Sequence, residues 1–129
     1  MLKAVLVMIL GGIGCLSRYG VGIAAQRLAG GRFPVGTLLV NVLGCFCAGL
    51  AAAYFATRGA GREEWRIAVM AGFLGGFTTF SAFGVQTFDL LRNGRCGHAA
   101  LNIALSVTLG LLAVWAGYRI GLSSLPPQP

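Results

Sequence analysis

Four long apolar stretches take up most of this chain of 129 residues and leave only short segments between them. A transmembrane helix needs about 20 mainly apolar residues, and each stretch is long enough. They run approximately over Leu2–Leu28, Phe33–Thr57, Ile67–Leu91 and His98–Gly121. Because the breaks between them are short and contain Gly and Arg, we expect consecutive helices to be antiparallel neighbours. The sequence therefore predicts an all-α membrane protein with four transmembrane helices.

The composition leaves no room for a soluble domain. Only 10% of the residues are charged, whereas a soluble domain has about 25%. Mean hydropathy is +0.81. The net charge is +7, but the basic residues stand singly or in small clusters at the ends of apolar stretches, which argues against nucleic-acid binding and for contact with membrane lipid. We expect a single transmembrane domain over residues 1–122 and a disordered, proline-rich tail over residues 123–129.

Basic residues are almost evenly divided between the two sides of the predicted bundle. Five fall on the side of the N-terminus, namely Lys3, Arg58, Arg62, Arg66 and Arg119. Four fall on the other side, namely Arg27, Arg32, Arg92 and Arg95. The Lys/Arg bias between the two sides sets the orientation of a membrane protein, and here it is nearly absent. Either one orientation wins weakly, or the chain inserts both ways and forms an antiparallel, dual-topology homodimer.

The third stretch is interrupted by the segment Gly72–Phe83, which reads GFLGGFTTFSAF. Its glycines and hydroxyl residues stand where a plain transmembrane helix would have Leu, Ile and Val. Irregular backbone at membrane depth is tolerated only where protein buries it or where it lines a cavity. The segment therefore predicts that the third helix is broken near mid-membrane, at a place where something binds or passes.

Neutral hydrogen-bonding side chains recur inside the apolar stretches. They are Thr37 and Asn41 in the second, Thr78, Thr79 and Ser81 in the third, and Asn102 and Ser106 in the fourth. The pairs four residues apart share one helix face. Each residue taken alone is explained by a helix–helix hydrogen bond. Together with the broken third helix, they also fit a polar pathway, and donors without carboxylates favour an anion.

Acidic residues are absent from the middle of every predicted span. Asp89 lies at the end of the third span near Arg92, and Glu63 and Glu64 lie in the second loop. Proton-coupled transporters use an intramembrane acid as a relay. The sequence therefore favours a passive channel over a small proton-coupled multidrug exporter, which is the main alternative. An assembly protein without transport is the third class, and we do not expect an enzyme.

Arg18 is the only basic residue that lies inside a predicted span and away from its ends. A bare Arg at a bilayer centre is costly. The side chain either reaches toward the helix end or supplies positive potential at the mouth of an aqueous vestibule.

Three segments of the chain resemble the CrcB/Fluc family of small bacterial fluoride channels. The first runs from Gly11-Gly12 to Arg18-Tyr19, and the second from Gly36-Thr37 through Asn41 to Phe46. The third and most specific is Gly72–Phe83 itself. The resemblance covers essentially the whole chain.

The resemblance implies a fluoride-selective passive channel that exports F⁻ from the cytoplasm across the bacterial inner membrane. It implies an antiparallel homodimer with two pores and a structural Na⁺ on the two-fold axis. Each pore would be lined by Phe80, Phe83, Asn41, Asn102, Ser106, Thr79 and Ser81. The backbone carbonyls of Gly75 and Thr78 from both subunits would bind the Na⁺. Ala82 and Gly84 replace hydroxyl residues of the family pattern, and Gln86 stands where an acid is common.

Overall fold

All regular structure in the computed structural model is helical, over the described residues 1–30, 33–58 and 62–124. Within these residues, 4 helical spans are long and apolar enough to cross a membrane, as the sequence predicts. The elements are α1 (Leu2–Leu28), α2 (Val35–Arg58), α3 (Glu63–Ile67), the π-helical η1 (Ala68–Leu74), α4 (Gly75–Phe77), α5 (Phe80–Arg92) and α6 (Cys96–Ser123).

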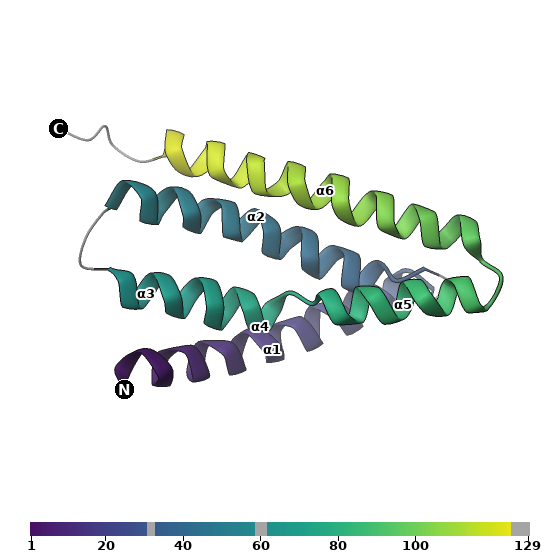
Figure 1. Ribbon diagram of the computed structural model, residues 1–129, viewed down its shortest axis with the longest axis horizontal. Helices are drawn as coiled ribbons and strands as arrows, with labels where there is room; N and C mark the ends of the chain where they lie inside the picture. Colours follow the sequence, from purple (N-terminus) through teal and green to yellow (C-terminus); the bar gives the residue numbers. More distant parts are fainter. Residues whose placement is uncertain (31–32, 59–61, 125–129) are drawn as a thin grey trace.

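The helices form an elongated bundle in which consecutive spans run in opposite directions (Figure 1). Helix α6 packs along α2, whereas η1 and α4 pack against α1. The start of α1 and the end of α6 lie at one end of the bundle, and the α1–α2 and α5–α6 turns lie at the other (Figure 1). Of the tail predicted over residues 123–129, Ser123 is the last residue of α6, and the residues beyond Ser124 lie outside the described ones.

Helix boundaries differ slightly from the expected ones, for local reasons. Helix α2 begins at Val35 rather than at Phe33, because the residue before a proline disfavours helical geometry. The third span begins at Glu63, four residues before the expected Ile67. Its early start is favoured by acidic residues in the first turn and by the Glu63–Arg66 ion pair, whose closest N–O distance is 2.7 Å.

The α5–α6 turn is closed by backbone hydrogen bonds around a glycine. Gly94 adopts a φ of 70°, in the left-handed region where a side chain is disfavoured. The Gly94 amide donates to the Leu91 carbonyl over 3.0 Å, and the Arg95 amide donates to the Leu90 carbonyl over 2.8 Å. This is the Schellman arrangement that ends a helix and turns the chain back.

Glycines allow the helices to touch backbone to backbone. A Cβ added at Gly14 of α1 would collide with the Phe73 carbonyl oxygen, and one at Gly76 would collide with the Gly11 carbonyl oxygen. A Cβ at Gly117 of α6 would likewise collide with the Phe46 carbonyl oxygen of α2. In the sequence, Gly72 and Gly76, like Gly117 and Gly121, have the small-xxx-small spacing that predicts close helix contact. The collisions at Gly76 and Gly117 confirm that prediction.

Candidate functional site

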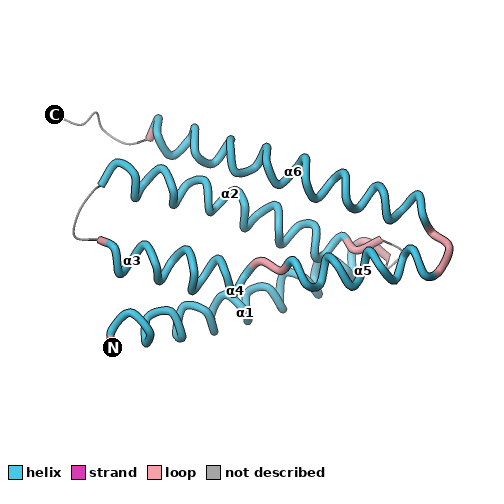
Figure 2. The backbone as a smooth tube through the Cα atoms, in the orientation of Figure 1, coloured by secondary structure: helices cyan, strands magenta, loops and turns pink. Residues whose placement is uncertain are grey.

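The third span leaves helical geometry at two consecutive threonines. Helix α4 ends at Phe77 and α5 begins at Phe80. Between them Thr78 has φ −83° and ψ 160°, and Thr79 has φ −152° and ψ 109°, both extended. The gap falls midway along the span (Figure 2). Thr79 also begins α5, because its Oγ1 accepts a hydrogen bond from the Ala82 amide at 3.2 Å.

Asn41 holds this interruption against α2 through both ends of its amide. Its Nδ2 donates to the Thr79 carbonyl over 3.1 Å, and its Oδ1 accepts the Thr79 N–H over 2.8 Å. In an uninterrupted α-helix the Thr79 N–H would bond the Gly75 carbonyl. Asn41 therefore replaces a helical hydrogen bond and stabilises the extended backbone.

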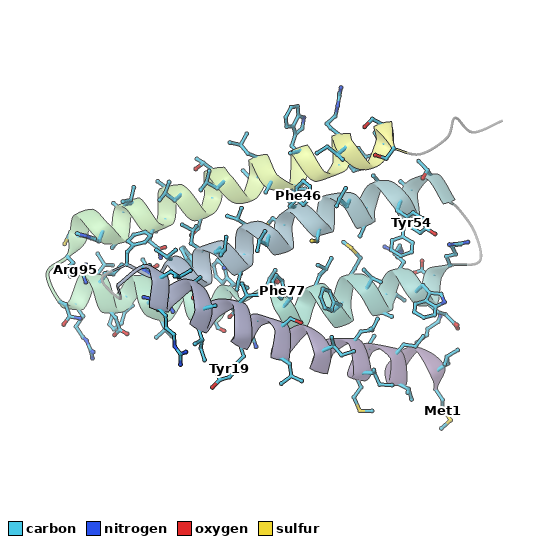
Figure 3. All side chains as sticks on the ribbon, turned by 180° about the vertical axis from the view of Figure 1, so that it is seen from behind. Met1, Tyr19, Phe46, Tyr54, Phe77 and Arg95 are labelled. Carbon is cyan, nitrogen blue, oxygen red and sulfur yellow. The ribbon has the colours of Figure 1, made fainter. Side chains whose placement is uncertain are left out.

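Arg18 reaches the interruption from α1. Its Nη1 donates to the Thr78 carbonyl over 3.3 Å, and its Nη2 lies 3.6 Å from the Cys15 sulfur. The side chain also lines a pocket beside the interruption. The vestibule role of Arg18 stays a prediction. Tyr19, its neighbour in sequence, points away from the bundle (Figure 3).

The pocket at the interruption has a volume of about 700 Å³. Its polar lining comes from α1, α2, the interruption and α5 and includes Arg18, Tyr19, Gln26, Thr37, Thr79, Ser81 and Gln86. Among the described residues that line it, none is acidic. The pocket thus combines one fixed positive charge with neutral donors, an arrangement that suits an anion better than a cation.

Phe80 and Phe83 lie together on the first turn of α5. Their ring centroids are 5.4 Å apart and the ring planes are tilted by 44°. Phe80 is 83% exposed in the isolated chain, so little of the described protein covers it. The pair that the sequence singled out is therefore adjacent in space and presents at least one ring outward.

The predicted polar residues of α6 do not line this pocket. Asn102 is only 2% exposed, and its Nδ2 donates to Thr87 Oγ1 over 2.9 Å. Ser106 is half-buried one turn further along α6. The structure thus brings together Arg18, Asn41, Thr78, Thr79, Ser81, Phe80 and Phe83 around the interruption, and it leaves Asn102 and Ser106 apart on the α6 side.

Two glutamines, Gln26 and Gln86, are prominent in the site although neither was expected to line it. Gln26 closes the α1–α2 turn, because its Nε2 donates to the Phe33 carbonyl over 3.1 Å and its Oε1 accepts the Gly36 amide over 3.2 Å. Gln86 lines the same pocket, and its buried Oε1 has no hydrogen-bond partner among the described residues. Both also line a second pocket of about 220 Å³ toward the α5–α6 turn. The sequence signal for Gln86 was its departure from the family pattern, and for Gln26 it was only a polar residue near a span end.

The two expected Na⁺ ligands differ in how well they fit a cation. The Gly75 carbonyl loses its usual donor, because the Thr79 N–H bonds Asn41 instead. A free carbonyl oxygen suits a hard cation. The Thr78 carbonyl already accepts a bond from the cationic Arg18 guanidinium. Gly75 therefore fits the expected role, whereas at Thr78 a cation would have to share the carbonyl with Arg18.

Comparison with known proteins assigns this chain to a family. Residues 5–118 match the family model described as "CrcB-like protein, Camphor Resistance (CrcB)". A protein of Solibacter usitatus named "Fluoride-specific ion channel FluC" is 45% identical over 116 residues, which cover 90% of this chain and 95% of that protein. A protein of the same name from Coxiella burnetii is 43% identical over 119 residues, which cover 91% of this chain and 96% of that protein.

A third protein of that name, from Rhizobium etli, is 45% identical over 120 residues, which cover 93% of this chain and 96% of that protein. These relatives are named as ion channels and not as enzymes. With its 4 candidate membrane spans and a family match over residues 5–118, this chain is a multi-pass bacterial membrane protein that belongs to the CrcB family of ion channels.

Proposed function

We propose that this chain forms a fluoride-selective passive channel of the bacterial inner membrane. The observation that carries the proposal is its 45% identity, over 90% of its length, to a protein named as a fluoride-specific ion channel. The pocket at the interruption supports it, because Arg18 and neutral donors line it without an acidic residue among the described lining. Fluoride would leave the cytoplasm down its electrochemical gradient.

Selectivity would rest on close hydrogen-bond donors and on pore width. Fluoride is small and strongly hydrated, so a pore must replace its water with donors that approach closely. Larger anions cannot bring the same donors into contact. Thr79 and Ser81 supply hydroxyls beside the Phe80 ring, whose positive edge also attracts an anion.

The pores would form between two antiparallel copies of the chain. Gly75, Phe80 and Ser81 are all exposed beside the interruption in the isolated chain. Irregular backbone does not face lipid, so protein or water must cover this surface. A second copy supplies that cover, and the near-even division of Lys and Arg permits insertion in both directions. Two copies then give two equivalent pores.

A structural Na⁺ at the axis of this dimer completes the proposal. The Gly75 carbonyl would be a ligand from each copy, together with the Thr78 carbonyl when it is shared with Arg18. The ion would supply positive charge that offsets carbonyl dipoles directed at one axis. A melting temperature of the purified dimer that rises with Na⁺ but not with K⁺ would support the site.

Efflux from liposomes tests the channel and separates it from the alternatives. Purified protein should release fluoride from loaded vesicles at a rate set by the voltage and not by a proton gradient, while chloride is retained. A proton-coupled multidrug exporter, the remaining alternative, would instead move protons only when its organic substrate is present. An assembly protein would release nothing, and absence of fluoride release would remove the proposal.

Dual topology has its own test, independent of transport. A reporter fused after Ser124 should appear on both sides of the membrane in comparable amounts. Appearance on one side only would rule out the antiparallel dimer while leaving the fluoride channel standing.

A further inference from the structure

A chain of hydrogen bonds connects α6 to the backbone of Phe83. Asn102 Nδ2 donates to Thr87 Oγ1 over 2.9 Å, and Thr87 Oγ1 donates to the Phe83 carbonyl over 2.7 Å. A hydroxyl has one proton, so this direction uses it fully and leaves the oxygen as the acceptor for Asn102. The amide of Asn102 thus acts on the aromatic turn of α5 through one intermediate side chain.

Both side chains are buried, whereas along α5 only Thr87 and Leu90 are buried. Asn102 is 2% exposed and Thr87 is 7% exposed. The large apolar side chains of α5 are mostly outward, with Phe80 83%, Val85 62% and Phe88 62% exposed. Apolar packing within the chain therefore does little to fix the rotation of α5 about its axis. A buried polar pair fixes it better, because each partner left unpaired would be penalised.

We propose that Asn102 is a positioning residue, which holds the Phe83 turn of α5 in place through Thr87. This role rests on the proposed fluoride pathway past Phe83, and it differs from the direct contact with the ion that the sequence suggested for Asn102. Asn41 holds the first residue before α5, at Thr79, and Asn102 holds the helix two turns later. Together they define both the position and the rotation of the aromatic pair.

Three variants and one control distinguish a positioning role of Asn102 from a role in helix–helix packing alone. Thr87→Val removes the bond to the Phe83 carbonyl and leaves the Asn102 amide buried without its partner. Thr87→Ser keeps the hydroxyl and should keep wild-type behaviour. The double variant Thr87→Val/Asn102→Leu replaces both polar groups with apolar ones, which restores stability in such pairs. Thr108→Val is the matched control, because Thr108 Oγ1 makes the same bond within its helix, to the Ala104 carbonyl, but is exposed.

Fluoride efflux, thermal stability and the environment of the ring at position 83 are the three readouts. We expect Thr87→Val to lower efflux by about tenfold, the factor given by the loss of one buried hydrogen bond. The double variant should regain the wild-type melting temperature and still conduct about tenfold less. Recovery of efflux together with stability in the double variant, or wild-type efflux in Thr87→Val, would overturn the positioning role.

The ring readout does not depend on conduction. With 4-fluorophenylalanine placed at position 83, the ¹⁹F resonance should shift or broaden in Thr87→Val and in the double variant. It should be unchanged in Thr87→Ser and Thr108→Val. An unchanged resonance in Thr87→Val refutes positioning even if the wild type conducts. If the resonance changes in Thr87→Val but the wild type does not conduct, positioning is supported and the fluoride channel is refuted.

Discussion

The two halves of the third span are held in the bundle by different forces. The first half, α3 to α4, packs on α1 through close backbone contact, and Ala68, Gly72, Leu74 and Phe77 are buried. The second half, α5, buries only Thr87 and Leu90. It is joined to its neighbours by the amides of Asn41 and Asn102.

Within one span, the first half is therefore a structural support, and the second half carries the surface that is proposed to face the ion. Backbone contact fixes the first half by shape and leaves no room for a Cβ at Gly14 or Gly76. Hydrogen bonds fix the second half at two points and leave its outward aromatic face uncovered. The interruption at Thr78 and Thr79 allows one half of the span to be held by backbone contact and the other by hydrogen bonds, because it uncouples the helical register of α4 from that of α5.

The largest expected effect comes from breaking the first half at Gly14. In Gly14→Ala the new Cβ meets the Phe73 carbonyl oxygen and lies 3.0 Å from the Phe77 backbone nitrogen. Backbone atoms cannot move aside cheaply, so destabilisation should reach or exceed the ~1–3 kcal/mol of an overpacked core. Size-exclusion profiles and melting temperature in detergent measure it.

Gly12→Ala is the matched control for that change. It lies in the same helix, but nothing lies within 4 Å of the added Cβ. It should fold and conduct like the wild type. Equal stability of the two variants would show that close α1 contact does not fix the first half.

The next effect comes from releasing the second half at Asn41. In the wild type, Asn41 Nδ2 lies 3.1 Å from the Thr79 carbonyl oxygen. Asn41→Asp replaces this donor with an oxygen that faces the same carbonyl. Repulsion between these oxygens should move the start of α5 and lower fluoride efflux by at least about tenfold, while the dimer survives. Efflux from liposomes and chemical crosslinking check the two parts.

Asn93→Asp is the control, since Asn93 Nδ2 donates to the Asp89 carbonyl over 2.8 Å but is exposed. It makes the same chemical change outside the site. Wild-type efflux in Asn41→Asp would remove Asn41 from the mechanism.

The contrast between the halves also explains what the sequence could predict. Hydropathy determines where spans begin and end, so the four spans were predicted to within a few residues. Glycine spacing predicted close contact, because only glycines let helix backbones approach. The glycine- and threonine-rich segment marked the region in which Thr78 and Thr79 leave helical geometry.

Partner choice could not be predicted in the same way. The spacing of Asn102 and Ser106 gives a helix face but not the neighbour that this face meets, so the bond from Asn102 to Thr87 was not foreseen. The reach of Arg18 to the Thr78 carbonyl depends on how α1 packs against the interruption, 60 residues away in sequence. Tertiary packing decides both, and periodicity carries no information about it.

A third effect, smaller because it leaves the fold untouched, concerns the outward face of α5. Phe80→Ile removes a ring that is 83% exposed in the isolated chain, so the monomer fold should keep its stability. Fluoride efflux should nevertheless fall by about tenfold or more, because the ring edge that faces the anion is lost. Phe88→Ile changes a 62% exposed ring on the same helix and should conduct normally. Equal efflux in the two variants would remove Phe80 from the pathway.

The smallest expected effect concerns the side of α5 that faces the pocket, at Gln86. Gln86→Glu adds a carboxyl group to a pocket that has Arg18 and no acidic residue in its described lining. Repulsion of the anion should lower efflux by about two- to fivefold, limited by the compensating charge of Arg18. Because part of this repulsion acts through water, the deficit should shrink as ionic strength rises. Gln86→Met keeps the size without the charge and separates the two causes. If Gln86→Met lowers efflux as much as Gln86→Glu does, the amide itself assists the anion. Gln86 would then join Asn41 and Asn102 as a residue that serves the second half of the span through hydrogen bonds.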